Sequence, residues 1–196
     1  MKFGQLYFIG GLTCIDFSNT FDHLHNPPEF DFFTEPAIIL DWGKAAGILP
    51  PGFIKTLTAG KKSISDLLEA RSLIFRLLMP LSRLEPPAPK DLACLNTKLQ
   101  KVTARINLIS THRRYALVYP ADNPLDRITS HVVRSMADLL LSDRYEHVRQ
   151  CSECGWLFYD ESRNHLRRWC SMKICGNRAK ARRHYERVRQ NRVNAA

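Results

Sequence analysis

The sequence predicts an α+β chain, in which a mainly helical N-terminal domain with a small β-sheet precedes a small C-terminal module. Three observations support this fold class. The chain has 196 residues, of which 44% are hydrophobic, so it can form one ordinary core plus a small module. Long segments with helical apolar spacing surround only a few β-prone runs. Four of the six cysteines lie after residue 150, in a segment crowded with arginine.

Apolar residues recur at helical spacing in five segments of the N-terminal part. These segments are 12–21, 36–47, 63–84, 90–107 and a stretch that begins at Pro124. Ser63 and Asp66 resemble a capping box at the start of the longest one. Pro80 should kink or shorten that helix, because proline cannot donate a backbone hydrogen bond.

Two places favour strands. Residues 5–9 predict a short strand that leads into Gly10 and Gly11, and residues 108–110 and 115–119 predict a hairpin around a basic turn. We place the domain boundary between residues 147 and 148. No glycine- or proline-rich linker precedes Cys151, so we expect the module 148–196 to be held close to the domain 1–147.

The positive charge of the chain is concentrated at its C-terminal end. Residues 149–196 carry a net charge of +8 out of +10, which favours a polyanionic partner. No run approaches the roughly 18 apolar residues of a membrane helix, and Gln5 and Asp16 interrupt any export signal. We therefore expect a cytoplasmic protein with reduced thiols, whose cysteines are metal ligands or buried apolar groups and not disulfides.

The late cysteines form two close pairs, Cys151-x2-Cys154 and Cys170-x4-Cys175, separated by fifteen residues. Two such pairs joined by a loop of this length are a common ligand set for one tetrahedral zinc ion. Because four thiolates leave no position for water, the spacing predicts one structural zinc and no catalytic metal.

The residues around the cysteines predict a treble-clef-like finger. The β-prone residues after Gly155 should form a hairpin that brings Cys170 back to the first pair. Ser171 is a candidate N-cap, which would put Cys175 in the first turn of the basic helix. Ile174, Ala181 and Val188 recur every seven residues and form a narrow apolar seam, which we expect to pack on the hairpin or on a partner helix.

Arginine and lysine dominate the surface of this helix and the preceding loop. The planar arginine fork suits phosphate, so these residues are candidates for nucleic-acid binding. A solvated helix that only keeps the protein soluble is the alternative. The candidate contacts are Arg163, Arg167, Arg168, Lys173, Arg178, Lys180, Arg182, Arg183, Arg187 and Arg189.

Two short motifs resemble known families. Cys175-Gly176-Asn177-Arg178, with the three earlier cysteines, is similar to the CGNR zinc-finger family of bacterial proteins. The segment 15–20, "IDFSNT", resembles the "LDFxNT" signature of the ABATE domain that usually accompanies this finger, with Ile15 in place of leucine. The resemblance implies a stress-induced transcription regulator whose finger binds DNA.

Other functions stay open at this point. The alternatives are an RNA-binding protein, a protein-interaction adaptor and an enzyme whose active site lies in the N-terminal domain. No GxxxxGK[ST], GxGxxG, HExxH or GxSxG motif supports the enzyme. A homodimer is possible, and no effector can be named. Two histidines and one acid in a loop, here Asp22, His23 and His25, are more often solvated side chains than ligands of a metal ion. The candidates for an effector pocket, or alternatively for a buried hydrogen-bond network, are Asp16, Asn19, Trp42 and Arg71.

Overall fold

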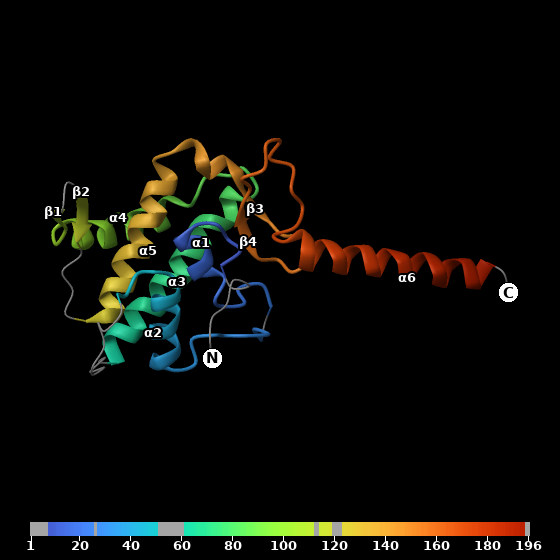
Figure 1. Ribbon diagram of the computed structural model, residues 1–196, viewed down its shortest axis with the longest axis horizontal. Coiled ribbons are helices and arrows are strands. Elements are labelled where there is room, and N and C mark those ends of the chain that lie inside the picture. The colour runs from blue at the N-terminus through green and yellow to red at the C-terminus, as the bar shows by residue number, and fades with distance from the viewer. Residues whose placement is uncertain (1–7, 26, 51–60, 112–113, 119–122, 195–196) are drawn as a thin grey trace.

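The computed structural model describes residues 8–25, 27–50, 61–111, 114–118 and 123–194 (Figure 1). These residues form a helical body, two separate two-stranded sheets and a long C-terminal helix. The mainly helical α+β class with a C-terminal finger is confirmed. In chain order the elements are α1 (Thr13–Ser18), α2 (Pro36–Ala45), α3 (Lys61–Leu81), α4 (Pro89–Thr103), β1 (Asn107–Thr111), β2 (Arg114–Val118), α5 (Pro124–Leu140), the 3-10 helix η2 (Asp143–His147), β3 (Val148–Gln150), β4 (Leu157–Tyr159), the π-helical turn η3 (Met172–Gly176) and α6 (Asn177–Asn194).

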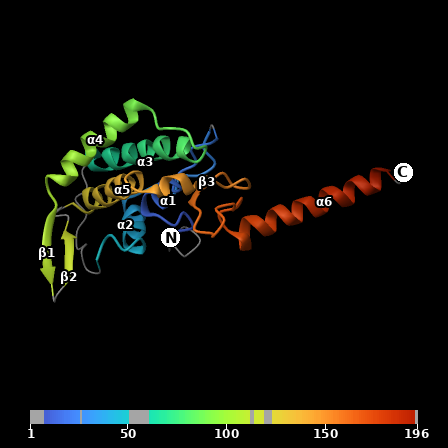
Figure 2. The same cartoon turned by 90° about the horizontal axis from the view of Figure 1, so that it is seen from above.

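Helices α3 and α5 form the centre of the body, and α1 and α4 pack against both (Figure 2). Their apolar faces produce one continuous core, which holds Leu67, Ile74 and Leu78 of α3 and Ile128 and Val132 of α5. This is the arrangement that the helical spacing predicts, because an amphipathic helix is stabilised mainly by burying its apolar face. Within the described residues no helix is both long and apolar enough to span a membrane.

The longest helix begins earlier than its sequence suggests. The structure places Ser63 inside α3, where its hydroxyl accepts a hydrogen bond of 2.8 Å from the side chain of Asn123. Asp66 pairs with Lys62 at 3.0 Å. The predicted capping box is therefore wrong, because helical backbone already precedes the serine. Pro80 lies in the last turn of α3, which ends at Leu81, so the predicted shortening is confirmed.

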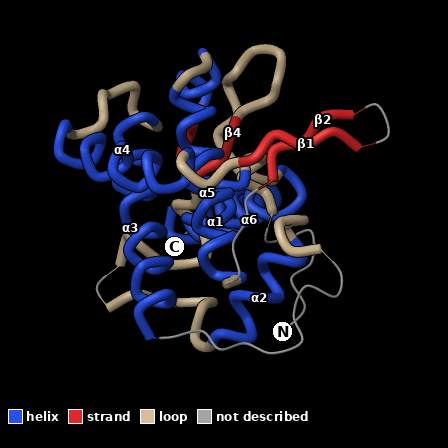
Figure 3. The backbone as a smooth tube through the Cα atoms, turned by 90° about the vertical axis from the view of Figure 1, so that its left-hand side faces the viewer, coloured by secondary structure: helices blue, strands red, loops and turns tan. Residues whose placement is uncertain are grey.

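The hairpin β1–β2 is confirmed and projects from the helices (Figure 3). It lies at the end of the molecule opposite α6 (Figures 1 and 2). Its large apolar side chains are exposed, among them Leu108, Tyr115 and Leu117. Of the strand predicted at 5–9, residues 5–7 lie outside the described part of the chain, and Phe8 and Ile9 are not in a strand.

The hairpin β3–β4 connects the body to the C-terminal module. Val148 and Leu157 point into the core of the body, whereas Phe158, on the opposite face, packs with the cysteines. Strand β4 pairs with β3, which precedes the first cysteine pair, and not with a strand that leads to Cys170. The predicted hairpin therefore exists with a different partner strand, since the turn at the first cysteine pair already reverses the chain.

Candidate functional site

The turn between β3 and β4 carries the first two cysteines. The backbone N–H of Gly155 donates to the carbonyl oxygen of Cys151 at 2.9 Å, and the N–H of Cys151 donates to that of Trp156 at 2.8 Å. Gly155 has a φ of +75°, a conformation that favours glycine. A Cβ at this position would also meet the side chain of Leu24, so the glycine allows the turn to lie against the body.

A loop from 160 to 169 carries the chain back to the first pair. The buried Asp160 organises the loop, because its carboxylate accepts hydrogen bonds from the N–H groups of Ser162 at 3.0 Å and Arg167 at 2.8 Å. Both the N–H and the hydroxyl of Ser152 donate to the carbonyl oxygen of Arg168. These bonds tie the loop to the turn and bring Cys170 to the first cysteine pair.

The fourth cysteine lies in η3, immediately before α6. The N–H of Gly176 donates to the carbonyl oxygen of Ser171 at 3.0 Å, which makes this turn π-helical. Ser171 occupies the N-cap position, but its side chain makes no capping hydrogen bond. Cys175 therefore lies in a wider turn that leads into the basic helix, and not in the first turn of that helix as the sequence suggested.

The four sulfur atoms lie close enough to share one metal ion. The Sγ atoms of Cys151, Cys154, Cys170 and Cys175 are all within 4.8 Å of one another. A tetrahedral site with Zn–S bonds of about 2.3 Å requires neighbouring sulfurs roughly 3.8 Å apart. The Sγ of Cys170 lies 3.7 Å from that of Cys154 and 3.7 Å from that of Cys175. The four cysteines could thus hold one zinc ion, and these separations are far too long for a disulfide.

The electrostatics of the cluster also fit a cation. Hydrogen bonds from Cys154 and Cys170 lower the pKa of Cys151. The hydrogen bond to Cys151 raises the pKa of Cys154 to about 12, and the same neighbour raises the pKa of Cys170. Four thiolates within this space repel one another unless a cation balances them, and a divalent metal ion does so.

A second group of possible ligands lies beside the finger. Asp22, His25 and Glu29 place ligand atoms within 4.8 Å of one another. The carboxylate of Asp22 accepts three backbone N–H groups, from Leu24, His25 and Glu29, so it builds a turn of the chain. His23 is not part of this group, because its ring stacks on Phe75 at 4.1 Å.

Helix α6 extends from the finger into solvent (Figures 1 and 2). The second turn of α6 is held by Glu153, whose side chain is 2% exposed. Arg182 donates two hydrogen bonds to the Glu153 carboxylate, of 2.9 and 2.6 Å. The predicted apolar seam does not pack on the hairpin along its length, because Ala181 is exposed and Ala179 is the buried alanine of α6. Packing of the seam on a partner helix stays a prediction. Only the first turns of the helix contact the rest of the chain, so the seven-residue spacing has no partner surface among the described elements.

Among the predicted cationic residues, four make contacts within the protein. Arg182 pairs with Glu153, and Arg167 donates to the carbonyl oxygen of Cys170 at 2.6 Å while its guanidinium covers the ring of Phe158. Arg183 donates to the carbonyl oxygen of Ala179 at 3.4 Å, and the guanidinium of Arg168 lies over the ring of Trp169. All except Arg167 are exposed, namely Arg163, Arg168, Lys173, Arg178, Lys180, Arg182, Arg183, Arg187 and Arg189.

Two of the candidates for an effector pocket connect the body to the finger. The side chain of Asn19 donates to the carbonyl oxygen of Leu157 at 2.8 Å and accepts from its N–H at 3.0 Å. Asp16 accepts from the N–H of Gly10 at 2.7 Å, and the carbonyl oxygen of Gly10 accepts from the N–H of Tyr159. The "IDFSNT" segment therefore holds β4 against the body.

The other two candidates have different partners. Arg71 forms two hydrogen bonds of 2.8 Å with Asp31 and lies against the rings of Phe21 and Phe33. Trp42 is buried among aromatic rings, including that of Phe33. The hydrogen bonds of Asp16, Asn19 and Arg71 agree with a buried network, and the effector pocket stays a prediction.

Two important residues of the site are absent from the sequence-based set. Glu153 lies between the first two cysteines and is one of four acidic residues after position 148. Its negative charge within a basic segment is the signal that could have identified it as a partner of an arginine. Asp160 shapes the return loop, but no local pattern distinguishes a loop-building aspartate from a solvated one.

Comparison with known families agrees with this site. Residues 147–188 match the CGNR zinc finger, and residues 11–143 match ABATE, a family described as a putative stress-induced transcription regulator. A search of curated proteins found no match. Since the ABATE match covers more than half of the chain and the finger match includes all four clustered cysteines, the chain belongs to the ABATE family of putative transcription regulators and carries a CGNR zinc finger.

Proposed function

We propose that the protein is a cytoplasmic, non-enzymatic transcription regulator that binds duplex DNA through its zinc finger and α6. In this proposal residues 148–196 are the DNA-binding part and residues 1–147 the regulatory part. The observation that carries it is a basic helix with an anchored start and a free surface (Figure 1). The cysteine cluster and Glu153 hold the first turns, and the following turns project from the body.

The exposed cations of α6 support a polyanionic partner. Glu186 is the single acidic residue in this 18-residue helix. Arginine side chains pair with phosphates through two parallel hydrogen bonds, and an α-helix fits the major groove of B-DNA. A lone helix with so many like charges gains little from burial, so phosphate contacts would stabilise it. We therefore assign the phosphate contacts to Arg178, Lys180, Arg183, Arg187 and Arg189.

The metal has a structural role in this proposal. The four cysteines would hold one zinc ion, which supplies a cross-link between the β3–β4 turn, the return loop and η3. The ion pair of Arg182 in α6 with Glu153 in the β3–β4 turn also helps to fix the direction of the helix. Loss of the metal should release the helix from the finger and thereby weaken DNA binding.

The body would sense a signal or hold a dimer, and one observation favours the dimer. The hairpin β1–β2 exposes Leu108, Ile109, Tyr115 and Leu117. An isolated two-stranded hairpin is marginally stable in water and benefits from a covering surface. Because the described strand residues carry a single charge, that of Arg114, and several exposed apolar side chains, a second copy of the same hairpin suits them better than a nucleic acid.

The test is the affinity of the zinc-loaded chain for fluorescein-labelled duplex DNA and for an RNA hairpin at equal salt. Contact with five phosphates predicts a slope of about −4.5 for the logarithm of affinity against the logarithm of salt concentration. Replacing Lys180, Arg183 and Arg187 by glutamine should remove most of this slope. The matched control replaces Lys90, Lys101 and Arg105, three exposed cations of the body, and should leave it unchanged.

The outcomes separate the alternatives. Tighter binding to RNA than to duplex DNA would identify an RNA-binding protein. Binding that is absent or independent of salt would contradict the proposal and favour an adaptor that binds another protein. Equal losses from the two triple variants would show that net charge, and not the surface of α6, attracts the nucleic acid.

A further inference from the structure

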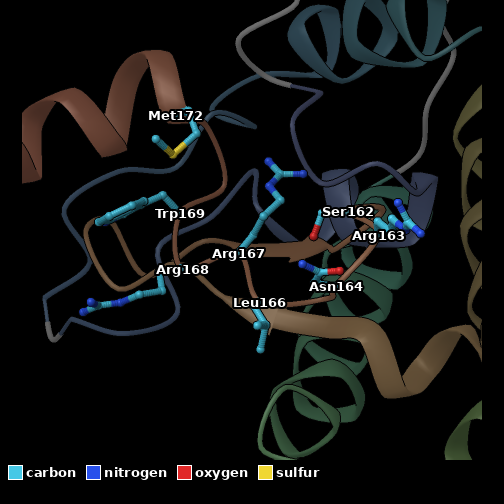
Figure 4. Close-up of a pocket in the computed structure, with 8 residues that line it drawn as sticks. All are labelled: Ser162, Arg163, Asn164, Leu166, Arg167, Arg168, Trp169 and Met172. Atoms are coloured by element: carbon cyan, nitrogen blue, oxygen red, sulfur yellow. The ribbon is translucent and has the colours of Figure 1, made fainter.

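A surface hollow lies beside the start of α6, on the return loop of the finger (Figure 4). It has a volume of about 600 Å³. Its lining combines the cations Arg163 and Arg168 with the apolar side chains of Leu166, Trp169 and Met172. None of the residues that line it is acidic, so the hollow is complementary to an anionic partner.

Two apolar side chains of the hollow are exposed to solvent. Leu166 is 79% exposed and Met172 is 49% exposed. The guanidinium of Arg168 lies over the ring of Trp169, 5.5 Å from its centroid. In Figure 4, Arg163 and Arg168 lie on either side of Leu166. Leu166 is thus an apolar tip between two cations.

Several contacts fix the loop in this conformation. His165, the residue before Leu166, has a φ of +49°. Its ring hydrogen-bonds the carbonyl oxygen of Asp160 at 2.8 Å and stacks on His147 with ring centroids 3.6 Å apart. The loop therefore does not fold its leucine inward, and Leu166 stays in water at a cost that a partner surface would remove.

We propose that this hollow is a second nucleic-acid contact, in which Arg163 and Arg168 bind phosphates while Leu166 packs against sugars and base edges in the neighbouring minor groove. The inference rests on the proposed function and adds a separate surface to it. Apolar side chains that enter the minor groove between flanking cations are a known means of bending a duplex. Met172 of η3 lines the hollow, and η3 leads directly into α6, so the hollow lies next to the start of the basic helix.

Two variants of the zinc-loaded full chain test the two halves of this contact. Leu166→Ser should weaken binding to a short random-sequence duplex by about tenfold, because it removes most of a buried leucine contact. It should leave the salt slope unchanged. With these two phosphates added to the five assigned to α6, the native slope should be about −6.3, and the double variant Arg163→Ala with Arg168→Ala should reduce its magnitude by about 1.8.

Matched changes on the body serve as controls. Leu141 is 85% exposed at the end of α5, and Arg105 is exposed after α4. Leu141→Ser and Arg105→Ala should leave the affinity and the slope unchanged. Zinc content and circular dichroism confirm that every variant is folded. Energy transfer between dyes at the two duplex ends measures bending, which should diminish in Leu166→Ser.

The results distinguish this inference from the proposed function. If the triple variant of α6 lowers the salt slope but Leu166→Ser binds and bends DNA like the native chain, the hollow is not a DNA contact and the role of α6 stands. If Leu166→Ser lowers the magnitude of the salt slope as well as the affinity, the loss of the leucine disturbs the loop, and the insertion of Leu166 into the minor groove is wrong. If the native chain binds no duplex, both proposals fail together.

Discussion

Asn19 provides the sharpest test of how the body holds the finger. Its side chain makes two hydrogen bonds to the backbone of Leu157, one to the carbonyl oxygen at 2.8 Å and one from the N–H at 3.0 Å. The two residues are 138 positions apart, so the pair joins the first helix to strand β4. Asn19 and Leu157 are both buried, which excludes water as a ready substitute.

The expected cost of Asn19→Ala follows from these contacts. The change leaves one buried N–H and one buried carbonyl group of Leu157 without a partner, and each such group costs about 1–3 kcal/mol. We expect the free energy of unfolding to fall by about 2–4 kcal/mol, after allowance for partial relaxation. A neutral surface substitution stays within about 0.5 kcal/mol.

The measurement is urea unfolding of the zinc-loaded chain, followed by circular dichroism and by tryptophan fluorescence. Asn96→Ala is the matched control, because Asn96 is exposed on α4. A loss below about 1 kcal/mol for Asn19→Ala, or a loss equal to that of the control, would refute the reasoning. It would mean that the hydrophobic packing of Leu157 alone seats the strand.

Three further predictions concern the metal, pH and assembly. Cys170→Ser should abolish stoichiometric zinc and lower the helical content by loss of α6 while the body stays folded, whereas Cys94→Ser, a change of an exposed cysteine, should retain the metal by elemental analysis. Burial raises the pKa of Asp16 from 3.8 to about 7, so the folded state binds the proton more tightly than the unfolded state and stability is lost as pH rises through that window. Asp16→Asn keeps an acceptor for the N–H of Gly10 but cannot titrate. In urea titrations, its free energy of unfolding relative to that of the native chain should therefore increase from pH 4 to pH 7 and level off above. A difference that is independent of pH would contradict the raised pKa of Asp16. Leu108→Ser with Tyr115→Ser should convert a dimer into a monomer in sedimentation experiments while Leu141→Ser does not, and a native chain that is monomeric at every concentration would exclude the hairpin as a dimer contact.

The parts of the molecule that could be predicted from sequence depend on local spacing. Cysteine pairs three and five positions apart identify the cluster, because ligands so close along the chain can reach one ion. The helical segments follow from apolar periodicity in the same way. Pro80 shortens α3 because proline lacks the backbone N–H that continues a helix, and this prediction needs no knowledge of the tertiary structure.

The parts that were wrong or missed depend on tertiary packing as well as on local spacing. The partner of β4 is the strand before the cysteine turn, and register between strands is set by packing that no single run of residues encodes. The pair of Glu153 and Arg182 spans 29 positions. The seam through Ala181 was expected to pack on the hairpin or on a partner helix, and the exposure of Ala181 contradicts the hairpin alternative alone, because a seven-residue spacing indicates a surface and not its occupant.

The placement of Val148 and Leu157 in the body's core limits how this finger can be engineered. A fragment cut at residue 148 and grafted onto another scaffold would carry two bare apolar side chains and lose the amide clasp of Asn19. Transplantation as a cassette should therefore give an insoluble product unless both positions are made polar. Under the proposed function, swapping α6 alone, beyond the turn that pairs with Glu153, is the better route to a new binding preference.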